Sequence, residues 1–178
     1  MITVQEIPQD WKDVLARVQG AFPGAIIAGG ALRDLYHGKP VKDVDIFIPI
    51  ENFGIQGLDS LKDLNLSLSP VGNGRANPDR KIFGIYQTML NGVQYELIFA
   101  SLNACDIHTF DINICQIQFN GDKIHATNEF FAGTCENTIR FINPQSEKRM
   151  NERTVRIAAK YPEYKIVKST AGFNVNGY

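Results

Sequence analysis

The stretch Lys-Asp-Val-Asp-Ile-Phe-Ile, residues 42–48, decides the fold that we expect for this chain. It is rich in β-branched and aromatic residues, which favour a β-strand. Side chains alternate between the two faces of a strand, so Asp43 and Asp45 project together while the aliphatic residues between and after them face the core. Their Cα atoms would lie roughly 6–7 Å apart, close enough for both carboxylates to bind one or two divalent cations. Like charges side by side on a strand repel each other, so we predict a metal site; the alternative is a solvated outer face.

A glycine turn precedes this strand in the sequence. Residues 25–28 are apolar, and Gly29-Gly30 leads into a segment, 31–38, with apolar residues at helical spacing and a glycine at its end. Two glycines between a strand and a helix let the backbone approach a ligand, and the helix start offers N–H groups to an anion. Arg33 is unfavourable for the dipole of the first turn, so we expect it to contact a phosphate oxygen. The alternative is a tight turn without a ligand.

Two segments together resemble a known signature: residues 29–34 (Gly-Gly-Ala-Leu-Arg-Asp) and 38–45 (Gly-Lys-Pro-Val-Lys-Asp-Val-Asp). It is the head-domain signature of the tRNA CCA-adding enzymes and bacterial poly(A) polymerases, which belong to the nucleotidyltransferase superfamily related to DNA polymerase β. The resemblance implies an α+β fold, a mixed and twisted β-sheet flanked by helices, with a short C-terminal helical neck-like segment. It also implies two Mg²⁺ ions held by carboxylates. The residues that would contact the nucleotide and its phosphates here are Gly29, Gly30, Arg33 and Lys42.

A β-hairpin supplies the candidate for a third carboxylate. Residues 81–90 and 93–99 flank Asn91-Gly92, a strong signal for a two-residue turn. In the family that this chain resembles, the third metal-binding carboxylate comes from a strand in this part of the sequence. Glu96 is the one acidic residue between Asp79 and Asp106, so we expect Asp43, Asp45 and Glu96 to be the catalytic, metal-binding set. The alternatives are Asp111 as the third carboxylate, or Glu96 as an exposed polar residue on a half-buried strand.

Residues 110–119, followed by a turn at Asn120-Gly121, are predicted to form a further strand. They are similar to a family segment that reads Arg-Arg-Asp-Phe-Thr-Ile-Asn, although His108 and Thr109 stand where an arginine and an aspartate are expected. The resemblance implies that Asn113 contacts the nucleotide or braces the catalytic strand.

The C-terminal part is similar to the start of the family's helical neck, over residues 153–160. Arg153 and Arg156 lie three residues apart on one helical face and are expected to contact phosphates or a base, whereas Val155 and Ala159 pack inward. A solvated charged face is the alternative. We therefore divide the chain into a nucleotidyltransferase head domain, 1–143, and a truncated neck-like helix and tail, 144–178.

Three further elements are predicted outside these motifs. Asp10 is expected to cap a helix whose apolar residues recur at helical spacing, and residues 58–64 to form a short helix. Residues 67–80 are predicted to be a mobile loop, either a flap over the nucleotide or a surface insertion.

Composition restricts the class of protein. A chain of 178 residues is long enough for one domain with a short appendage, and a net charge of −1 means that any contact with nucleic acid must be local. No apolar run is long enough to span a membrane, and the start has no signal-peptide pattern. Three widely spaced cysteines favour reduced thiols and a cytoplasmic location.

The predicted function is template-independent, Mg²⁺-dependent transfer of a nucleoside monophosphate from an NTP to an acceptor hydroxyl, with release of pyrophosphate. An RNA 3′ end is the preferred acceptor. The alternatives are nucleotidylation of a protein or a small molecule, and an inactive module that binds nucleotide or protein. The sequence determines neither the NTP nor the oligomeric state.

Overall fold

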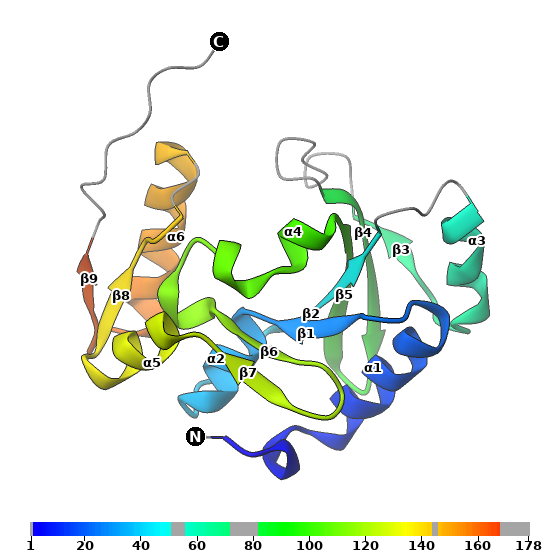
Figure 1. Cartoon of the computed structure of the whole chain (residues 1–178), viewed down its shortest axis with the longest axis horizontal. Helices are drawn as coiled ribbons and strands as arrows, with labels where there is room; N and C mark the ends of the chain where they lie inside the picture. Colours follow the sequence, from blue (N-terminus) through cyan, green and yellow to red (C-terminus); the bar gives the residue numbers. More distant parts are fainter. Residues whose placement is uncertain (1, 51–55, 72–81, 144–145, 168–178) are drawn as a thin grey trace.

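A computed structural model of the chain describes residues 2–50, 56–71, 82–143 and 146–167 (Figure 1). Its main element is a seven-stranded sheet in the order β3-β4-β5-β2-β1-β6-β7, and a small sheet pairs β8 with β9. The strands are β1 (Ile26–Ala28), β2 (Asp43–Pro49), β3 (Ser69–Pro70), β4 (Ile82–Leu90), β5 (Val93–Ala100), β6 (Ile117–Phe119), β7 (Ile124–Ala126), β8 (Thr138–Arg140) and β9 (Lys165–Val167). The α-helices are α1 (Gln9–Ala21), α2 (Gly30–Tyr36), α3 (Gln56–Asp63), α4 (Leu102–Cys105), α5 (Asn128–Cys135) and α6 (Glu147–Lys160).

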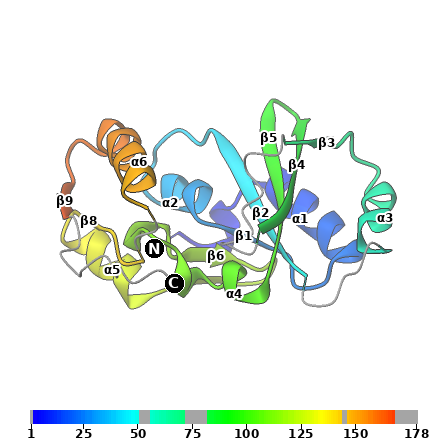
Figure 2. The same cartoon turned by 90° about the horizontal axis from the view of Figure 1, so that it is seen from above.

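The seven-stranded sheet is mixed, as predicted. β2 and β5 run parallel, whereas the other pairs within this sheet are antiparallel. Figure 2 shows α5, α6, β8 and β9 gathered at one end of the molecule and α3 at the opposite end. The chain is therefore an α+β protein, and the expected fold class is confirmed.

The main core lies on the face of the sheet that α1 and α2 cover. Alternate residues of β2 and β5 are completely or almost completely buried there, which explains why these strands carry aliphatic and aromatic residues at every second position. α1 buries Trp11, Val14, Leu15 and Val18, as their spacing predicts. Its N-cap is Pro8, so the prediction for Asp10 was wrong: Asp10 lies inside the first turn, where a carboxylate is favourable for the helix dipole.

The hairpin between β4 and β5 is confirmed. Asn91 and Gly92 both have positive φ, 50° and 79°, as a type I′ turn requires. The short helix predicted at 58–64 is α3, shifted toward the N-terminus. Within the predicted loop 67–80, Ser69 and Pro70 instead pair with β4, and residues 72–80 lie outside the described residues.

The continuous strand predicted for residues 110–119 was wrong. Only Ile117–Phe119 belong to the sheet, Asn113–Cys115 form a 3₁₀ turn, and Ile112 makes an isolated bridge with Phe141. The chain turns because the buried Asn113 side chain bonds the backbone of β8. The apolar residues of this segment therefore enter a second, smaller core. Its members are Ile112, Ile114, Cys115, Ile139, Phe141, Met150, Ile157, Tyr161 and Tyr164.

The C-terminal helix exists, but its inward face differs from the prediction. α6 begins after Ser146, whose hydroxyl accepts a bond from the Arg149 N–H, and it buries Met150 and Ile157. Val155 is 72% exposed, so its predicted inward orientation was wrong, and Ala159 is also exposed. Among the residues with described positions, no helix has the length and apolar character needed to cross a bilayer.

Candidate nucleotidyl-transfer site

The two aspartates of β2 project from one face of the strand. Asp43 and Asp45 are partly buried, whereas Val44, Ile46 and Ile48 are completely buried on the opposite face. The alternation predicted from the sequence is confirmed for this strand. The aspartates therefore lie on the face of the sheet opposite the main core.

Glu96 lies on the neighbouring strand, directly beside the aspartates. In the parallel pairing of β2 with β5, Asp45 is opposite Glu96 and Asp43 is opposite Gln94. Adjacent strands are about 4.8 Å apart, and residues paired in register project to the same face. Glu96 is 6% exposed, and its Oε1 accepts a hydrogen bond of 3.1 Å from Gln94 Nε2. The register thus places three carboxylates at adjacent positions of the sheet.

Asp111, the alternative third carboxylate, lies outside the seven-stranded sheet and has a different partner. Its Oδ2 atom is 2.8 Å from Arg153 Nη1, and the Asp111 side chain is only 7% exposed. This ion pair joins the segment after α4 to the C-terminal helix.

The chemistry of the three carboxylates fits Mg²⁺, which prefers oxygen ligands. In the described part of the chain, however, no three His, Cys, Asp or Glu side chains are grouped in a way that could hold an ion. The Asp43 carboxylate lies 3.6 Å from Lys42 Nζ, and Glu96 accepts the bond from Gln94. The sheet places the three residues at adjacent backbone positions. Their carboxylates would have to turn toward one another to share an ion.

The glycine turn lies beside the aspartate strand. β1 pairs antiparallel with β2 through Ile26 with Phe47 and Ile27 with Ile46, a register that leads the end of β1 toward Asp45. Gly29 follows with φ 83°, and a Cβ there would lie 3.3 Å from the Phe110 ring. The positive φ at position 29 therefore favours glycine. The turn itself lies next to the strand that carries the aspartates.

Arg33 does not reach out from this turn. Its side chain is 12% exposed and donates to Asp34 Oδ1 at 2.7 Å and to Cys115 Sγ at 3.1 Å. In this structure the guanidinium bonds protein groups, and contact between Arg33 and a phosphate stays a prediction.

Asp34, which the sequence reasoning missed, is the centre of a buried polar cluster. Its carboxylate accepts bonds from Arg33, from Lys160 Nζ and from the Tyr161 hydroxyl, the last at 2.7 Å. The cluster fastens α2, which begins at the glycine turn, to the end of α6. The sequence signal was the acidic residue within the signature itself, but two of its partners, Lys160 and Tyr161, lie more than a hundred residues away.

Asn113 is also structural. It is completely buried, its amide donates to the Thr138 carbonyl at 3.0 Å, and its Oδ1 accepts from the Arg140 N–H at 2.9 Å. The enclosed side chain braces β8 rather than the aspartate strand, and a nucleotide contact by Asn113 stays a prediction.

The packing around Asn113 gives a test of this role. A Cβ at Gly133 would lie 2.1 Å from Asn113 Nδ2 and 2.8 Å from the Thr138 carbonyl oxygen, so we expect Gly133→Ala to destabilise the fold by about 1–3 kcal/mol. Gly20→Ala is the matched control, since no atom lies within 4 Å of its Cβ position, and it should stabilise α1 by up to about 1 kcal/mol. Urea denaturation measures both; equal midpoints would contradict the description of this contact.

His37 lies next to the Asp34 cluster, among aromatic rings. Its Nδ1 bonds the Arg33 carbonyl at 2.7 Å, so Nδ1 carries a proton, and the buried Nε2 has no hydrogen-bond partner among the described residues. The rings of Tyr161 and Tyr164 pack edge-on against it. Burial lowers the pKa of His37 below its ordinary value of 6.5, so the neutral ring is favoured in the folded state.

This lowered pKa predicts a pH dependence of stability. Below about pH 6.5 the unfolded chain binds a proton at His37 that the folded chain does not. The contribution of the neutral His37 to the free energy of unfolding is therefore complete above that pH, and it is lost as the pH falls toward the pKa of the folded state. We expect the free energy of unfolding to fall between pH 7.5 and pH 5.5 by more in the wild type than in His37→Gln, as measured by urea titrations. Parallel pH profiles for the two proteins would exclude this contribution.

The remaining predicted site residues lie in different settings. Arg153 is ion-paired with Asp111, whereas Arg156 is exposed on α6. Lys42 is 82% exposed beside Asp43. Nucleotide contact by Lys42, Arg153 or Arg156 stays a prediction.

The chain resembles several solved structures. A tRNA-processing enzyme in an apo form has 20% identity and a TM-score of 0.62, and the match covers 94% of this chain and 45% of that one. The Thermotoga maritima CCA-adding enzyme, solved with tRNA, has 16% identity and a TM-score of 0.64, covering 94% of this chain and 42% of that one. The Bacillus stearothermophilus CCA-adding enzyme with CTP has 20% identity and a TM-score of 0.55, covering 84% and 36%.

No protein-family model and no curated protein matches the chain. The chain spans less than half the length of these solved proteins. The similarity at this level of identity establishes the fold, which is that of a nucleotidyltransferase-like head domain.

Proposed function

We propose that this chain is a Mg²⁺-dependent, template-independent nucleotidyltransferase that adds a nucleoside monophosphate to an RNA 3′ end. The observation that carries the proposal is the strand register that pairs Glu96 on β5 with Asp45 on β2. β2 also pairs with β1, the strand that leads into the glycine turn. Three carboxylates beside a turn that favours glycine, on this fold, match what a bound NTP with its cations requires.

Asp43, Asp45 and Glu96 would hold the cations. When bound, Mg²⁺ lowers the pKa of the acceptor hydroxyl and neutralises charge on the triphosphate. The bond from Gln94 restrains the Glu96 carboxylate on the face that the aspartates share. Gly29 and Gly30 would let the phosphates approach the backbone, and the exposed Lys42 ammonium would contact them.

The transfer itself would be an in-line substitution. The 3′ oxygen of the acceptor attacks the α-phosphorus, the bond from that phosphorus to the bridging oxygen breaks, and pyrophosphate leaves with the electron pair. The hydroxyl proton passes to solvent or to a neighbouring carboxylate. Most of the rate enhancement would then come from positioning and from electrostatic stabilisation.

RNA is the acceptor that the surroundings support best. The outward side of α6 presents exposed Lys148, Arg149 and Arg156, which suit a phosphate backbone. The Thermotoga maritima enzyme was solved with tRNA, which favours the same class of acceptor. Since this chain spans less than half of such proteins, we propose RNA as a class rather than CCA addition to tRNA.

Incubation with α-phosphate-labelled NTPs, Mg²⁺ and separate pools of RNA, protein and metabolites tests this function. We expect label at RNA 3′ ends, lost on treatment with a 3′ exonuclease and absent without Mg²⁺. Label confined to the protein or metabolite pool would replace RNA by another acceptor. Absence of label from all pools, under conditions where the NTP binds, would identify a binding module.

A further inference from the structure

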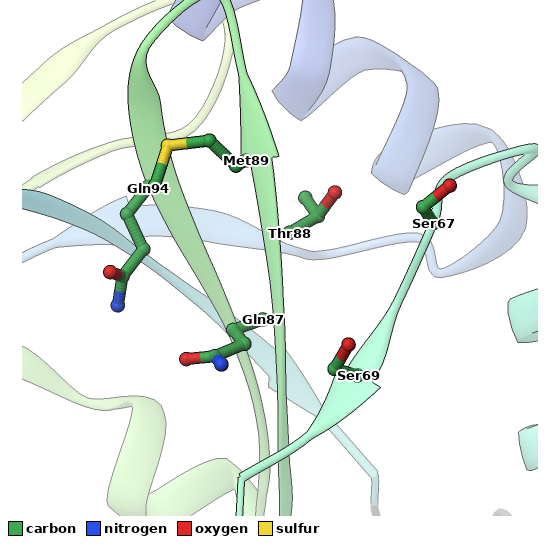
Figure 3. A pocket seen from close by; sticks show the side chains of 6 residues that line it. All are labelled: Ser67, Ser69, Gln87, Thr88, Met89 and Gln94. Carbon is green, nitrogen blue, oxygen red and sulfur yellow. The ribbon is translucent and has the colours of Figure 1, made fainter.

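An open cavity of about 300 Å³ lies at the edge of the sheet and is lined in part by Gln94, the hydrogen-bond partner of Glu96. Its lining residues are Ser67, Ser69, Gln87, Thr88, Met89 and Gln94 (Figure 3). β3 pairs with β4 at Gln87 and Tyr86, whereas β4 continues to Leu90. The cavity lies along the part of β4 after Gln87, which β3 does not cover. Figure 3 shows Gln87, Met89 and Gln94 extending to one side of β4 and Thr88 to the side of Ser67.

A row of polar residues connects this cavity to the aspartates. Across four strands, Ser69 is paired with Gln87, Gln87 with Glu96, and Glu96 with Asp45. Residues paired in register project to the same face, so the row begins in the cavity and ends at the carboxylates. Gln94, which lines the cavity, also donates the hydrogen bond to Glu96.

The order of the strands gives the cavity a defined place relative to the reaction. The glycine turn follows β1, the carboxylates lie on β2 and β5, and the cavity lies on β5, β4 and β3. In phosphoryl transfer the attacking and leaving oxygens are roughly in line with the phosphorus between them. If the triphosphate lies toward the glycine turn, the attacking hydroxyl must come from the opposite side, which is the side of the cavity.

The lining of the cavity fits a neutral, planar ligand better than a phosphate. Among the described residues, those that line the cavity have carboxamide, hydroxyl and thioether side chains and carry no charge. Carboxamides and hydroxyls bond the edges of a nucleobase and the hydroxyls of ribose, and the 61% exposed Met89 offers a polarisable apolar contact to a ring. The volume is at the lower end of the range for small-molecule sites and suits one nucleoside.

We propose, on the basis of the function proposed above, that this cavity binds the 3′-terminal nucleoside of the RNA acceptor. Gln87 and Met89 contact the base, and the terminal hydroxyl is presented toward Glu96 and Asp45. The incoming NTP lies on the other side of the carboxylates and does not occupy the cavity.

Met89→Asp tests the cavity without altering a carboxylate or its hydrogen-bond partner. We expect this variant to raise the KM for a short single-stranded RNA by at least about tenfold, because the added charge repels the RNA and the apolar contact is lost. The KM for the NTP should stay within about twofold of the wild type. Met89→Leu, which keeps the apolar contact, should have the same KM for the RNA as the wild type.

Phe83→Asp is the matched control, since Phe83 lies on the same strand with a similar exposure of 60% and does not line the cavity. It adds the same charge and should leave the acceptor KM unchanged. An equal increase with Phe83→Asp, or an increase in the KM for the NTP instead of the RNA, would overturn the assignment.

Photocrosslinking separates this inference from the proposed function. An RNA whose 3′-terminal base is 4-thiouridine should crosslink to a peptide that contains Met89 or Gln87, even in a protein without transfer activity. Crosslinks at the cavity without transfer would keep the binding site and reject the catalysis. Transfer with crosslinks elsewhere, or no RNA binding by the wild type, would reject the cavity as the acceptor site.

Discussion

Asp45→Asn should abolish nucleotidyl transfer, with a loss of more than about 100-fold in kcat. Asparagine has about the same size as aspartate, but it lacks the negative charge that would bind a cation beside Glu96. Because Asp45 lies on the partly buried face and not in the core, the fold should persist, with a thermal midpoint within about 3 °C of the wild type. Incorporation of an α-phosphate-labelled nucleotide into RNA measures the loss.

Asp122→Asn provides the control for this experiment. Asp122 is exposed in the turn between β6 and β7, away from β2 and β5 in the strand order, and the same change there should leave kcat unaltered. An Asp45→Asn protein that is folded and retains wild-type transfer would remove Asp45 from the catalytic set.

Asp34→Ala should lower the stability of the protein more than any surface substitution. Its carboxylate is buried and holds Arg33, Lys160 and the Tyr161 hydroxyl, so its removal leaves two cations without their shared partner. Breaking such a buried pair costs about 3–5 kcal/mol. For a chain of this length we expect the thermal midpoint to fall by roughly 6–20 °C, as measured by calorimetry or circular dichroism.

A surface ion pair of the same region is the comparison. Glu163 lies 2.9 Å from Lys39 with 47% of its side chain exposed, so Glu163→Ala should lower the stability far less than Asp34→Ala does. If Asp34→Ala cost as little as Glu163→Ala, the Asp34 cluster would not fasten α2 to α6. Asp34→Asn, which retains hydrogen-bonding groups without the charge, should fall between the two.

The fold was largely predictable from local patterns. The alternation in residues 42–48 and the Asn91-Gly92 turn specify a strand and a hairpin by themselves, because side-chain period and backbone handedness are local properties. The family resemblance predicted that Glu96 would join the two aspartates. The strand register that pairs Glu96 with Asp45 could be read only from the structure.

The rest of the site depends on partners distant in sequence. Arg33 and Asn113 were expected to contact a nucleotide, but each bonds groups from the residue after α6, from β8 or from the 3₁₀ turn before β6. Arg153 turns inward to Asp111 because a buried carboxylate requires a counter-charge, and this rotates Val155 toward solvent. Such pairs carry no periodic signal, so one sequence alone does not reveal them.

A crystal structure with Mn²⁺ and a non-hydrolysable NTP tests the central claim most directly. The account predicts anomalous peaks within about 2.0–2.3 Å of carboxylate oxygens of Asp45 and Glu96, with Asp43 nearby and the phosphates toward Gly29. Mn²⁺ bound elsewhere, or liganded by Asp111 while Glu96 keeps its bond to Gln94, would contradict it.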